Sequence, residues 1–176
     1  MKIVSKRKAI ELLKKYANSE ESFKAILAHT RAVAKLAVEI AKDVPGVDVE
    51  FIEGAALLHD IGRFKAKETV KHGIAGRDIL LSEGLPEYAS VAERHLGAGI
   101  SKEDIIQQKI DLPLKDYVPV TKEEKIITHA DNLIEINRVI SVEKTVERFR
   151  KEVGEEAARR VKRLALEVEN MRKIDE

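Results

Sequence analysis

The side chains best suited to chemistry in this sequence are histidines and aspartates spread along most of its length. Four of the five histidines belong to this set, and two aspartates complete it: His29, His59, Asp60, His72, His95 and Asp131. Imidazole nitrogens and carboxylate oxygens are preferred ligands of first-row divalent metal ions. Six such groups are enough for two ions that share a carboxylate, an arrangement suited to phosphoester hydrolysis. The chain has no cysteine, so thiolate metal sites, disulfides and a cysteine nucleophile are excluded.

Helices must position these residues, because apolar residues recur at helical spacing and strand-type alternation is almost absent. Cap residues, glycines and prolines predict helices over residues 5–16, 19–43, 48–60, 72–83, 86–96, 101–108 and from 121 onward. We expect an irregular loop at 109–120. From Ser141 we expect one long charged helix, or two in series that are broken at Gly154. The predicted fold class is all-α, a compact helical bundle around a central metal site.

Helical geometry indicates that the candidate ligands face the core. At about 100° per residue, His29 shares a helix face with the apolar residues Ile26 and Val33. Asp131 likewise shares a face with Ile127. A carboxylate on an apolar stripe costs free energy unless it is paired or bound to a metal. This placement therefore favours ligands over exposed polar residues.

Two further positions refine the set. His59 and Asp60 fall at the end of a helix that is apolar on nearly all sides, where a frayed last turn lets both side chains point toward one ion. Asp60 is the natural bridging ligand, because it offers two oxygens where a histidine offers one nitrogen. His129 lies about 200° from Asp131 around the same helix, so it is left out of the set.

The composition sets limits on the class of protein. The chain has 176 residues, 44% of them hydrophobic, and a net charge of +1 from 32 basic and 31 acidic side chains. We expect a single domain over 1–176 with its own core. The balanced charge argues against nucleic acid as a partner. No apolar run approaches the length needed to span a membrane, and no signal peptide is recognised, so a cytoplasmic protein without membrane association is expected.

The ordered pattern H…HD…H…H…D resembles the HD superfamily of metal-dependent phosphohydrolases. The residues His59-Asp60-Ile61-Gly62 also spell the HDIG subtype. Within that superfamily the chain is similar to the symmetrical diadenosine tetraphosphate hydrolases and to uncharacterised archaeal HDIG proteins. The similarity to the tetraphosphate hydrolases rests on three short stretches: His72-Gly73, Ala130-Asp131 followed by Glu135, and Asn137-Arg138. The segment Leu96-Gly97-Ala98-Gly99 departs from those hydrolases, and most of the GYP signature of the HD-GYP phosphodiesterases is absent.

The resemblance implies an HD-domain helical bundle with a motif core at about 20–140 and a helical extension at 141–176. It further implies one or two divalent ions, with Fe, Mn, Co, Ni and Zn left open. The first ion is assigned to His29, His59, Asp60 and Asp131. Asp60 would bridge to a second ion held by His72 and His95. Asp60 and Asp131 are also candidates for accepting a proton during catalysis.

Three cations are candidates for binding the substrate phosphate. Arg63 and Lys65 follow the HD pair directly, and Arg63 is also a candidate for stabilising charge in the transition state. Arg138 is seven residues after Asp131, which predicts the same helix face two turns on. The alternatives are a solvated turn for Arg63 and Lys65, and a surface ion pair with Glu135 or Glu143 for Arg138.

The function expected from these features is metal-dependent hydrolysis of a phosphomonoester or phosphoanhydride in a nucleotide-like substrate. One alternative is a single-metal nucleotidase acting on nucleoside monophosphates, in which His72 and His95 are structural. Another is a non-catalytic module that senses a nucleotide through a bound metal. A third is a helical interaction protein with a vestigial site. The substrate identity and a homo-oligomeric state stay open.

Overall fold

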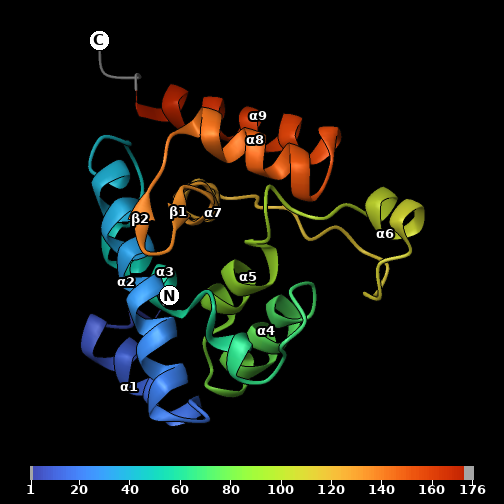
Figure 1. The fold of residues 1–176 in the computed structure, drawn as a ribbon. Helices are drawn as coiled ribbons and strands as arrows, with labels where there is room; N and C mark the ends of the chain where they lie inside the picture. The colour runs from blue at the N-terminus through green and yellow to red at the C-terminus, as the bar shows by residue number, and fades with distance from the viewer. Residues whose placement is uncertain (1, 173–176) are drawn as a thin grey trace.

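A computed structural model of the protein describes residues 2–172, and the regular secondary structure of this part of the chain is almost entirely helical (Figure 1). The elements in chain order are α1 (Lys6–Tyr16), α2 (Glu20–Ala41), α3 (Val49–Leu58), the 3₁₀ turn η1 (Ile61–Phe64), α4 (His72–Ser82), α5 (Pro86–Arg94), α6 (Lys102–Gln108), α7 (Lys122–Asn132), β1 (Ile134–Glu135), β2 (Arg138–Val139), α8 (Val142–Glu152) and α9 (Glu155–Arg172). The expected all-α class is confirmed.

Most helices begin at a side-chain cap that the sequence announces. The capping residues, whose side chains accept a hydrogen bond from a backbone N–H three residues further on, are Ser5, Ser19, Asp48, Ser101, Thr121 and Ser141. These bonds satisfy amide groups that a helix otherwise leaves unpaired in its first turn. The predicted capping box of Thr121 and Glu124 is present at the start of α7.

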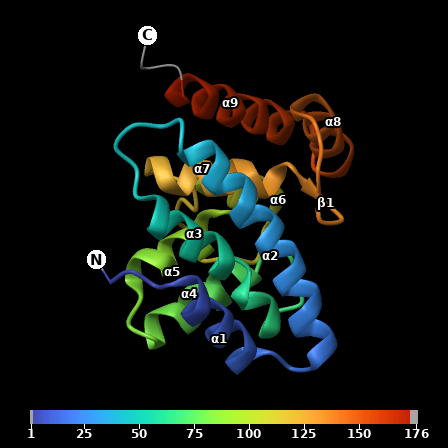
Figure 2. The same ribbon diagram turned by 90° about the vertical axis from the view of Figure 1, so that its left-hand side faces the viewer.

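The centre of the bundle is α3, which packs against α1, α2, α5 and α7 (Figure 2). Its four residues Ala55 to Leu58 are at most 1% exposed. A helix with almost no polar face has to be covered on nearly all sides, and three of its neighbours, α2, α5 and α7, carry or directly precede candidate ligands. Beside it, α4 and α5 pack closely because Gly73 and Gly76 bring their backbones together.

The C-terminal helices lie across one end of the bundle (Figure 1). The chain breaks between α8 and α9 at Gly154, whose φ of +128° favours glycine. The predicted break at Gly154 is thus confirmed. Leu164 and Val168 of α9 belong to the main hydrophobic core, and α8 packs on α9 around a second cluster that includes Val146. Residues 173–176 of the predicted extension lie outside the described residues.

Two of the differences between predicted and observed helix ends affect the placement of candidate site residues. The third helix stops at Leu58 instead of Asp60, because Asp60 leaves the helical conformation with φ −99° and ψ 9°. The seventh stops at Asn132, and the chain then reverses in a hairpin in which β1 pairs antiparallel with β2. Asn137, with φ +62°, turns this hairpin. Arg138 therefore lies on β2, and the helical argument that placed it above Asp131 is incorrect.

Every helix within residues 2–172 is either too short or too polar to cross a lipid bilayer. One short element stands apart from the bundle: α6 projects from its side together with the loop that follows it (Figure 1). Backbone hydrogen bonds between Ile100 and Tyr117 hold the two ends of this arm together.

Candidate metal centre

The six candidate ligands come from five helices or their ends, and their side chains meet at one buried site. His29 comes from the middle of α2, and Asp131 comes from the last turn of α7. His59 directly follows α3, His72 begins α4 and His95 directly follows α5. The side chains of Asp131 and His29 are 19% and 27% exposed, and those of the other ligand candidates are at most 3% exposed. Segments far apart in the sequence thus form a common polar site within the core.

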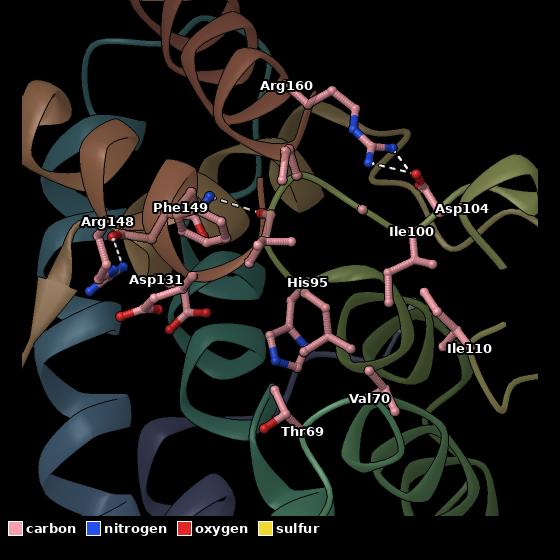
Figure 3. Close-up of a pocket in the computed structure, with 18 of the residues that line it drawn as sticks. Thr69, Val70, His95, Ile100, Asp104, Ile110, Asp131, Arg148, Phe149 and Arg160 are labelled. Carbon is pink, nitrogen blue, oxygen red and sulfur yellow. Dashed lines mark hydrogen bonds and ion pairs between the residues drawn. The ribbon is translucent and has the colours of Figure 1, made fainter. Parts of the chain in front are cut away.

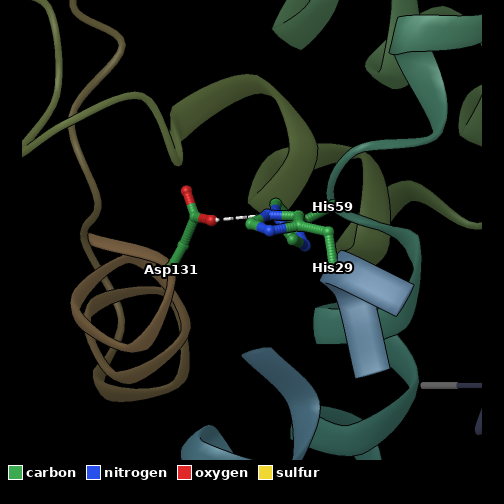
Figure 4. A group of neighbouring side chains, drawn as sticks. All are labelled: His29, His59 and Asp131. Carbon is green, nitrogen blue, oxygen red and sulfur yellow. Dashed lines mark hydrogen bonds and ion pairs between the residues drawn. The ribbon is translucent and has the colours of Figure 1, made fainter. Parts of the chain in front are cut away.

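Three of the side chains make a first group, formed by His29, His59 and Asp131 (Figure 4). Nε2 of His29 lies 2.9 Å from Oδ1 of Asp131, and Nε2 of His59 lies 3.4 Å from the same oxygen. Two ligands at about 2.0–2.1 Å from one tetrahedral ion lie roughly 3.3 Å apart. The 2.9 Å contact is also a hydrogen bond, and because all three ligand atoms lie within 4.8 Å of one another, the group could hold a single cation.

A second group surrounds Oδ1 of Asp60. Nε2 of His72 lies 3.0 Å from this oxygen and Nε2 of His95 lies 3.3 Å from it. The two imidazole nitrogens are 3.0 Å apart. The other oxygen of Asp60, Oδ2, faces the first group, at 3.6 Å from Nε2 of His29 and 3.9 Å from Nε2 of His59. Asp60 thus stands between the two groups, as expected for a bridging carboxylate.

The local backbone explains how His59 and Asp60 reach the same site. Because α3 ends at Leu58, the two residues are released from the roughly 100° divergence of helical neighbours. The turn η1 then brings Gly62 against the start of α4, where a Cβ atom would overlap the backbone of His72 and Gly76. The glycine of the HDIG motif therefore allows the close approach that places His72 beside Asp60.

The imidazole hydrogen bonds fix which nitrogens are free to bind a cation. Nδ1 of His59 lies 2.6 Å from the carbonyl oxygen of Ala56, and Nδ1 of His95 lies 2.8 Å from that of Ala92. A carbonyl only accepts, so each Nδ1 carries a proton, and each ring when neutral presents a lone pair at Nε2. Such second bonds commonly orient metal-binding histidines.

Three buried atoms of the cluster residues lack a hydrogen-bond partner: Nε2 of His59, Oδ1 of Asp60 and Nδ1 of His72. Buried polar atoms without partners are uncommon. Nε2 of His59 and Oδ1 of Asp60 face the cluster, and together with the all-nitrogen and oxygen donor set they fit a first-row divalent ion. The residues present therefore fit the metal that the sequence predicts.

The electrostatics of the site favour positive charge at its centre. Burial alone would lower the pKa of His59, but the carboxylates of Asp60 and Asp131 outweigh it and raise that pKa to about 9. Burial would raise the pKa of both carboxyl groups, yet the neighbouring histidines, His59 above all, hold them below their usual range. Burial lowers the pKa of His72. A divalent cation supplies the positive charge that these carboxylates favour.

The three candidate phosphate-binding cations are not equally placed. Arg63 lines the cavity next to the cluster, and its Nε donates to Oδ2 of Asp60 at 2.7 Å. Lys65 is exposed and does not line this cavity. Arg138 is exposed on β2 and does not line it either. Only Arg63 of the three therefore adjoins the ligand cluster.

A cavity of about 620 Å³ opens from the cluster toward the C-terminal helices (Figure 3). His29, His95 and Asp131 form part of its wall. Residues that the sequence reasoning did not single out form another part, including Asn132, Arg148, Phe149 and Arg160. The available signal was weak: Phe149 is the only aromatic residue in the segment 141–176, and it follows an arginine.

His129 lies outside the cluster, as the helical geometry predicts. It is 3% exposed and lies on another face of α7. Burial is the main cause that lowers its pKa to about 4, and the charges of Glu169 and Arg172 on α9 modify the effect. His129 is thus a neutral core residue.

An all-α bundle that gathers histidines and an HD pair in its core defines a class of protein. A family model described as "HD domain" matches residues 26–136, and the chain belongs to this family. Among its relatives is an uncharacterised protein of Methanocaldococcus jannaschii, 40% identical over 152 residues, which cover 84% of this chain and 85% of the relative. The suspected membership of the HD superfamily is therefore confirmed.

Two further relatives are much longer than this chain. A protein of Picrophilus torridus is 39% identical over 154 residues, and one of Thermoplasma volcanium is 38% identical over 156. Both are named tRNA (cytidine(56)-2'-O)-methyltransferase. The likeness covers 87% and 88% of this chain but only 44% of each relative, so the chain spans less than half of their length.

Solved structures support the fold. The HD domain of the phosphodiesterase PgpH from L. monocytogenes superposes with a TM-score of 0.53 at 16% identity, covering 92% of this chain and 97% of that domain. The same domain in complex with cyclic-di-AMP also gives a TM-score of 0.53, at 17% identity, covering 96% and 98%. At this identity the likeness establishes a shared fold.

Proposed function

We propose that the protein is a metal-dependent phosphohydrolase that cleaves a phosphomonoester or phosphoanhydride of a nucleotide-like substrate with water. Membership of the HD family supports metal-dependent phosphohydrolase chemistry in general. The observation that carries the proposal further is the position of Asp60, whose two oxygens face separate pairs of histidines. This arrangement supports two ions that share Asp60, whereas in the single-metal alternative His72 and His95 would be the hydrogen-bonding partners of Oδ1.

Bound divalent ions supply Lewis acidity, which polarises a phosphoryl oxygen and lowers the pKa of water. The protein's own residues position the reaction around them. Asp131 adjoins the cavity with a partly exposed carboxylate, so it is the candidate acceptor for the proton of the attacking water. Arg63 presents a cation at the same wall and is placed to stabilise negative charge on the phosphoryl group.

The names of the similar proteins add one class of compound to the substrates that should be tested. The solved PgpH domain is a phosphodiesterase crystallised with cyclic-di-AMP, so cyclic dinucleotides belong in the substrate panel. We do not propose methyl transfer for this protein. The two relatives named tRNA (cytidine(56)-2'-O)-methyltransferase are more than twice as long as the stretch that matches this chain.

Elemental analysis combined with an activity assay tests the proposal. We expect two transition-metal ions per chain in the wild type, one in His95→Ala and fewer than one in Asp60→Asn. His129→Gln is the matched control, since His129 is a buried histidine outside the cluster. With Mn²⁺ or Co²⁺ added, the wild type should hydrolyse p-nitrophenyl phosphate, its bis ester or a member of a nucleotide panel. Asp60→Asn should be at least about a hundredfold slower.

Each alternative has a distinct outcome in this experiment. One ion per chain in both wild type and His95→Ala would favour the single-metal nucleotidase. A fully metallated wild type without turnover would favour the sensing module. A protein that binds no metal at all would leave a helical interaction protein with a vestigial site.

A further inference from the structure

The cavity beside the cluster is larger than a phosphate group alone requires. Its volume of about 620 Å³ falls within the range of about 300–1,000 Å³ that suits a small organic ligand. The metal-site residues occupy only one part of its wall. The remainder comes from η1 and the loop before α4, the loop that follows α5, α6 and the loop after it, β1, and the two C-terminal helices, so most of the cavity is available to the non-reacting part of a substrate.

The helix α8 is tied directly to the end of α7 that carries Asp131. Nη2 of Arg148 donates to the carbonyl oxygen of Asn132 at 2.9 Å, and the hydroxyl oxygen of Thr145 lies 3.3 Å from the same oxygen. Nδ2 of Asn132 in turn donates to the carbonyl oxygen of Gly97 at 2.8 Å. These contacts hold α8 against Asn132, the residue that directly follows the candidate metal ligand Asp131.

Phe149 places an aromatic surface on this wall. Among the cavity-lining residues of the described chain it is the one phenylalanine, tyrosine or tryptophan, and it is half-buried. A Cβ at Gly97 would lie 3.1 Å from Cε1 of the ring, so the glycine lets the ring settle against the backbone. Aliphatic side chains, including Ile100 and Ile110, line another side of the cavity (Figure 3). A space bounded by an aromatic ring and aliphatic groups suits a flat, weakly polar ring system.

Arg148 adds a cation near the reacting end. In Figure 3 it lies on the same side of the cavity as Asp131. The nearest carboxylate to its guanidinium is Glu135 at 3.7 Å, which also pairs with Lys144 at 3.3 Å. The carbonyl of Asn132 takes only part of its hydrogen-bonding capacity, because a guanidinium has five N–H donors.

Arg160, the arginine that α9 brings to the cavity, is already held in an ion pair. Its two terminal nitrogens donate to the carboxylate of Asp104 at 2.5 and 2.9 Å. The contrast leaves Arg148 as the C-terminal cation with capacity to hold an anionic group.

We propose that α8 is the substrate-recognition wall of this enzyme: Phe149 stacks on the base of a nucleoside phosphate, while Arg148 binds its phosphate. This inference rests on the proposed function and deepens it, because it assigns substrate recognition to the segment 141–152, which lies outside the matched HD domain. It explains why a domain with its ligands between residues 29 and 131 carries two more helices packed against its cavity.

Binding of two non-hydrolysable probes tests the proposal without requiring turnover. The probes are methylenediphosphonate and adenosine 5'-(α,β-methylene)diphosphate, measured by calorimetry on Mn²⁺-loaded protein. We expect the wild type to bind the nucleoside probe about tenfold or more tightly than the base-free probe. Phe149→Leu should lose most of this preference and keep its affinity for methylenediphosphonate within about twofold, while Phe149→Tyr should retain it.

The arginine has its own matched pair of variants. Arg148→Gln should weaken both probes about tenfold, since it removes a phosphate contact common to them. Arg150→Gln on the same helix should change neither, because Arg150 is exposed and pairs with Glu147 and Glu155. Thermal melting of each variant identifies any that fails to fold.

The outcomes separate this inference from the proposed function. A Phe149→Leu variant that binds the nucleoside probe like the wild type, or that loses both probes equally, would overturn the recognition wall. So would a wild type that hydrolyses p-nitrophenyl phosphate but shows no preference for the nucleoside probe. A wild type that prefers the nucleoside probe but hydrolyses no phosphoester would contradict the proposed function and would still support the recognition wall.

Discussion

At the scale of single residues, Asp60 decides the chemistry of the site. Each of its oxygens lies near a different pair of imidazole nitrogens, and Oδ2 also accepts a bond from Arg63. A carboxylate buried to this degree is destabilising unless it is compensated. Histidines, an arginine and, in the proposed enzyme, divalent ions provide that compensation. Asp60→Asn keeps the shape of the side chain and removes the charge, so it is the most informative substitution.

Gly62 should tolerate no side chain. Gly62→Ala places a methyl group into the backbone of His72 and Gly76, so α4 must move and separate His72 from Asp60. We expect a loss of about 3 kcal/mol in the free energy of unfolding, together with loss of part of the bound metal. Urea denaturation and elemental analysis measure the two effects.

Gly84→Ala is the matched control for this substitution, because a Cβ at Gly84 meets open space although its φ is +71°. It should cost about 1–2 kcal/mol from backbone strain and leave the metal content unchanged. Equal metal loss in both variants would contradict the role assigned to Gly62.

His129 should make the protein sensitive to acid. Its pKa is lowered from 6.5 to about 4 by burial, so in the folded protein it stays neutral where the unfolded chain already binds a proton. The unfolded state therefore binds more protons between these values, and stability falls as the pH falls from about 6.5 toward 4. The slope should approach about 1.4 kcal/mol per pH unit.

His129→Gln should have a smaller slope over the same range, because the variant lacks the titrating group. Denaturant unfolding of both proteins at several pH values between 4 and 7 checks this. Parallel curves would show that His129 contributes nothing to the acid sensitivity.

At the scale of the elements, the ends of helices do the positioning. His59 and His95 directly follow α3 and α5, His72 begins α4, and Asp131 lies in the last turn of α7. Side chains at helix ends escape the fixed angular spacing of the helix interior. Ligands from several helices therefore reach one point without straining any of them.

The arm that carries α6 should depend on one ion pair. Arg160→Gln removes the two bonds to Asp104 but keeps the cap that Asp104 forms with Ser101. Because the pair is largely buried, with side chains 22% and 10% exposed, amide hydrogen exchange in α6 should quicken about tenfold. Arg159→Gln, which removes an exposed pair with Glu156, is the control and should leave α6 unchanged. Equal exchange in both variants would contradict the prediction.

At the scale of the whole molecule, the ligand cluster links five helices that are distant in the sequence. A cation held there joins α2, α4, α5 and α7 to the segment that follows α3. Such an ion binds only the folded chain, because the unfolded chain does not hold its ligands together, so binding adds directly to stability.

Removal of metal should therefore lower the melting temperature. An ion present at about a hundred times its dissociation constant adds about 2.7 kcal/mol. This corresponds to roughly 5–10 °C for a chain of this size. Calorimetry before and after treatment with a chelator measures the shift. Asp60→Asn should melt at the same temperature with and without the chelator, and a wild type that behaves likewise would show that no ion supports the fold.

Much of this protein follows from its sequence alone. The helix starts at Ser19, Ser101 and Thr121 are set by hydrogen bonds within four residues, so local sequence specifies them. The inward placement of His29 and Asp131 follows from helical periodicity. The motif residues specify the HD family, since the types and order of the ligands are themselves the chemistry.

Only the tertiary structure decided the rest. Contacts between segments that are separated along the chain determine which histidines each oxygen of Asp60 faces. Such contacts also explain why Gly62 has no side chain. Arg138 was misplaced because periodicity does not register the turn that ends α7. Phe149 was missed because an amphipathic helix looks the same whether its apolar face packs on the core or lines a cavity. Local sequence patterns determine where a helix forms, whereas packing of the whole chain determines which segments that helix contacts.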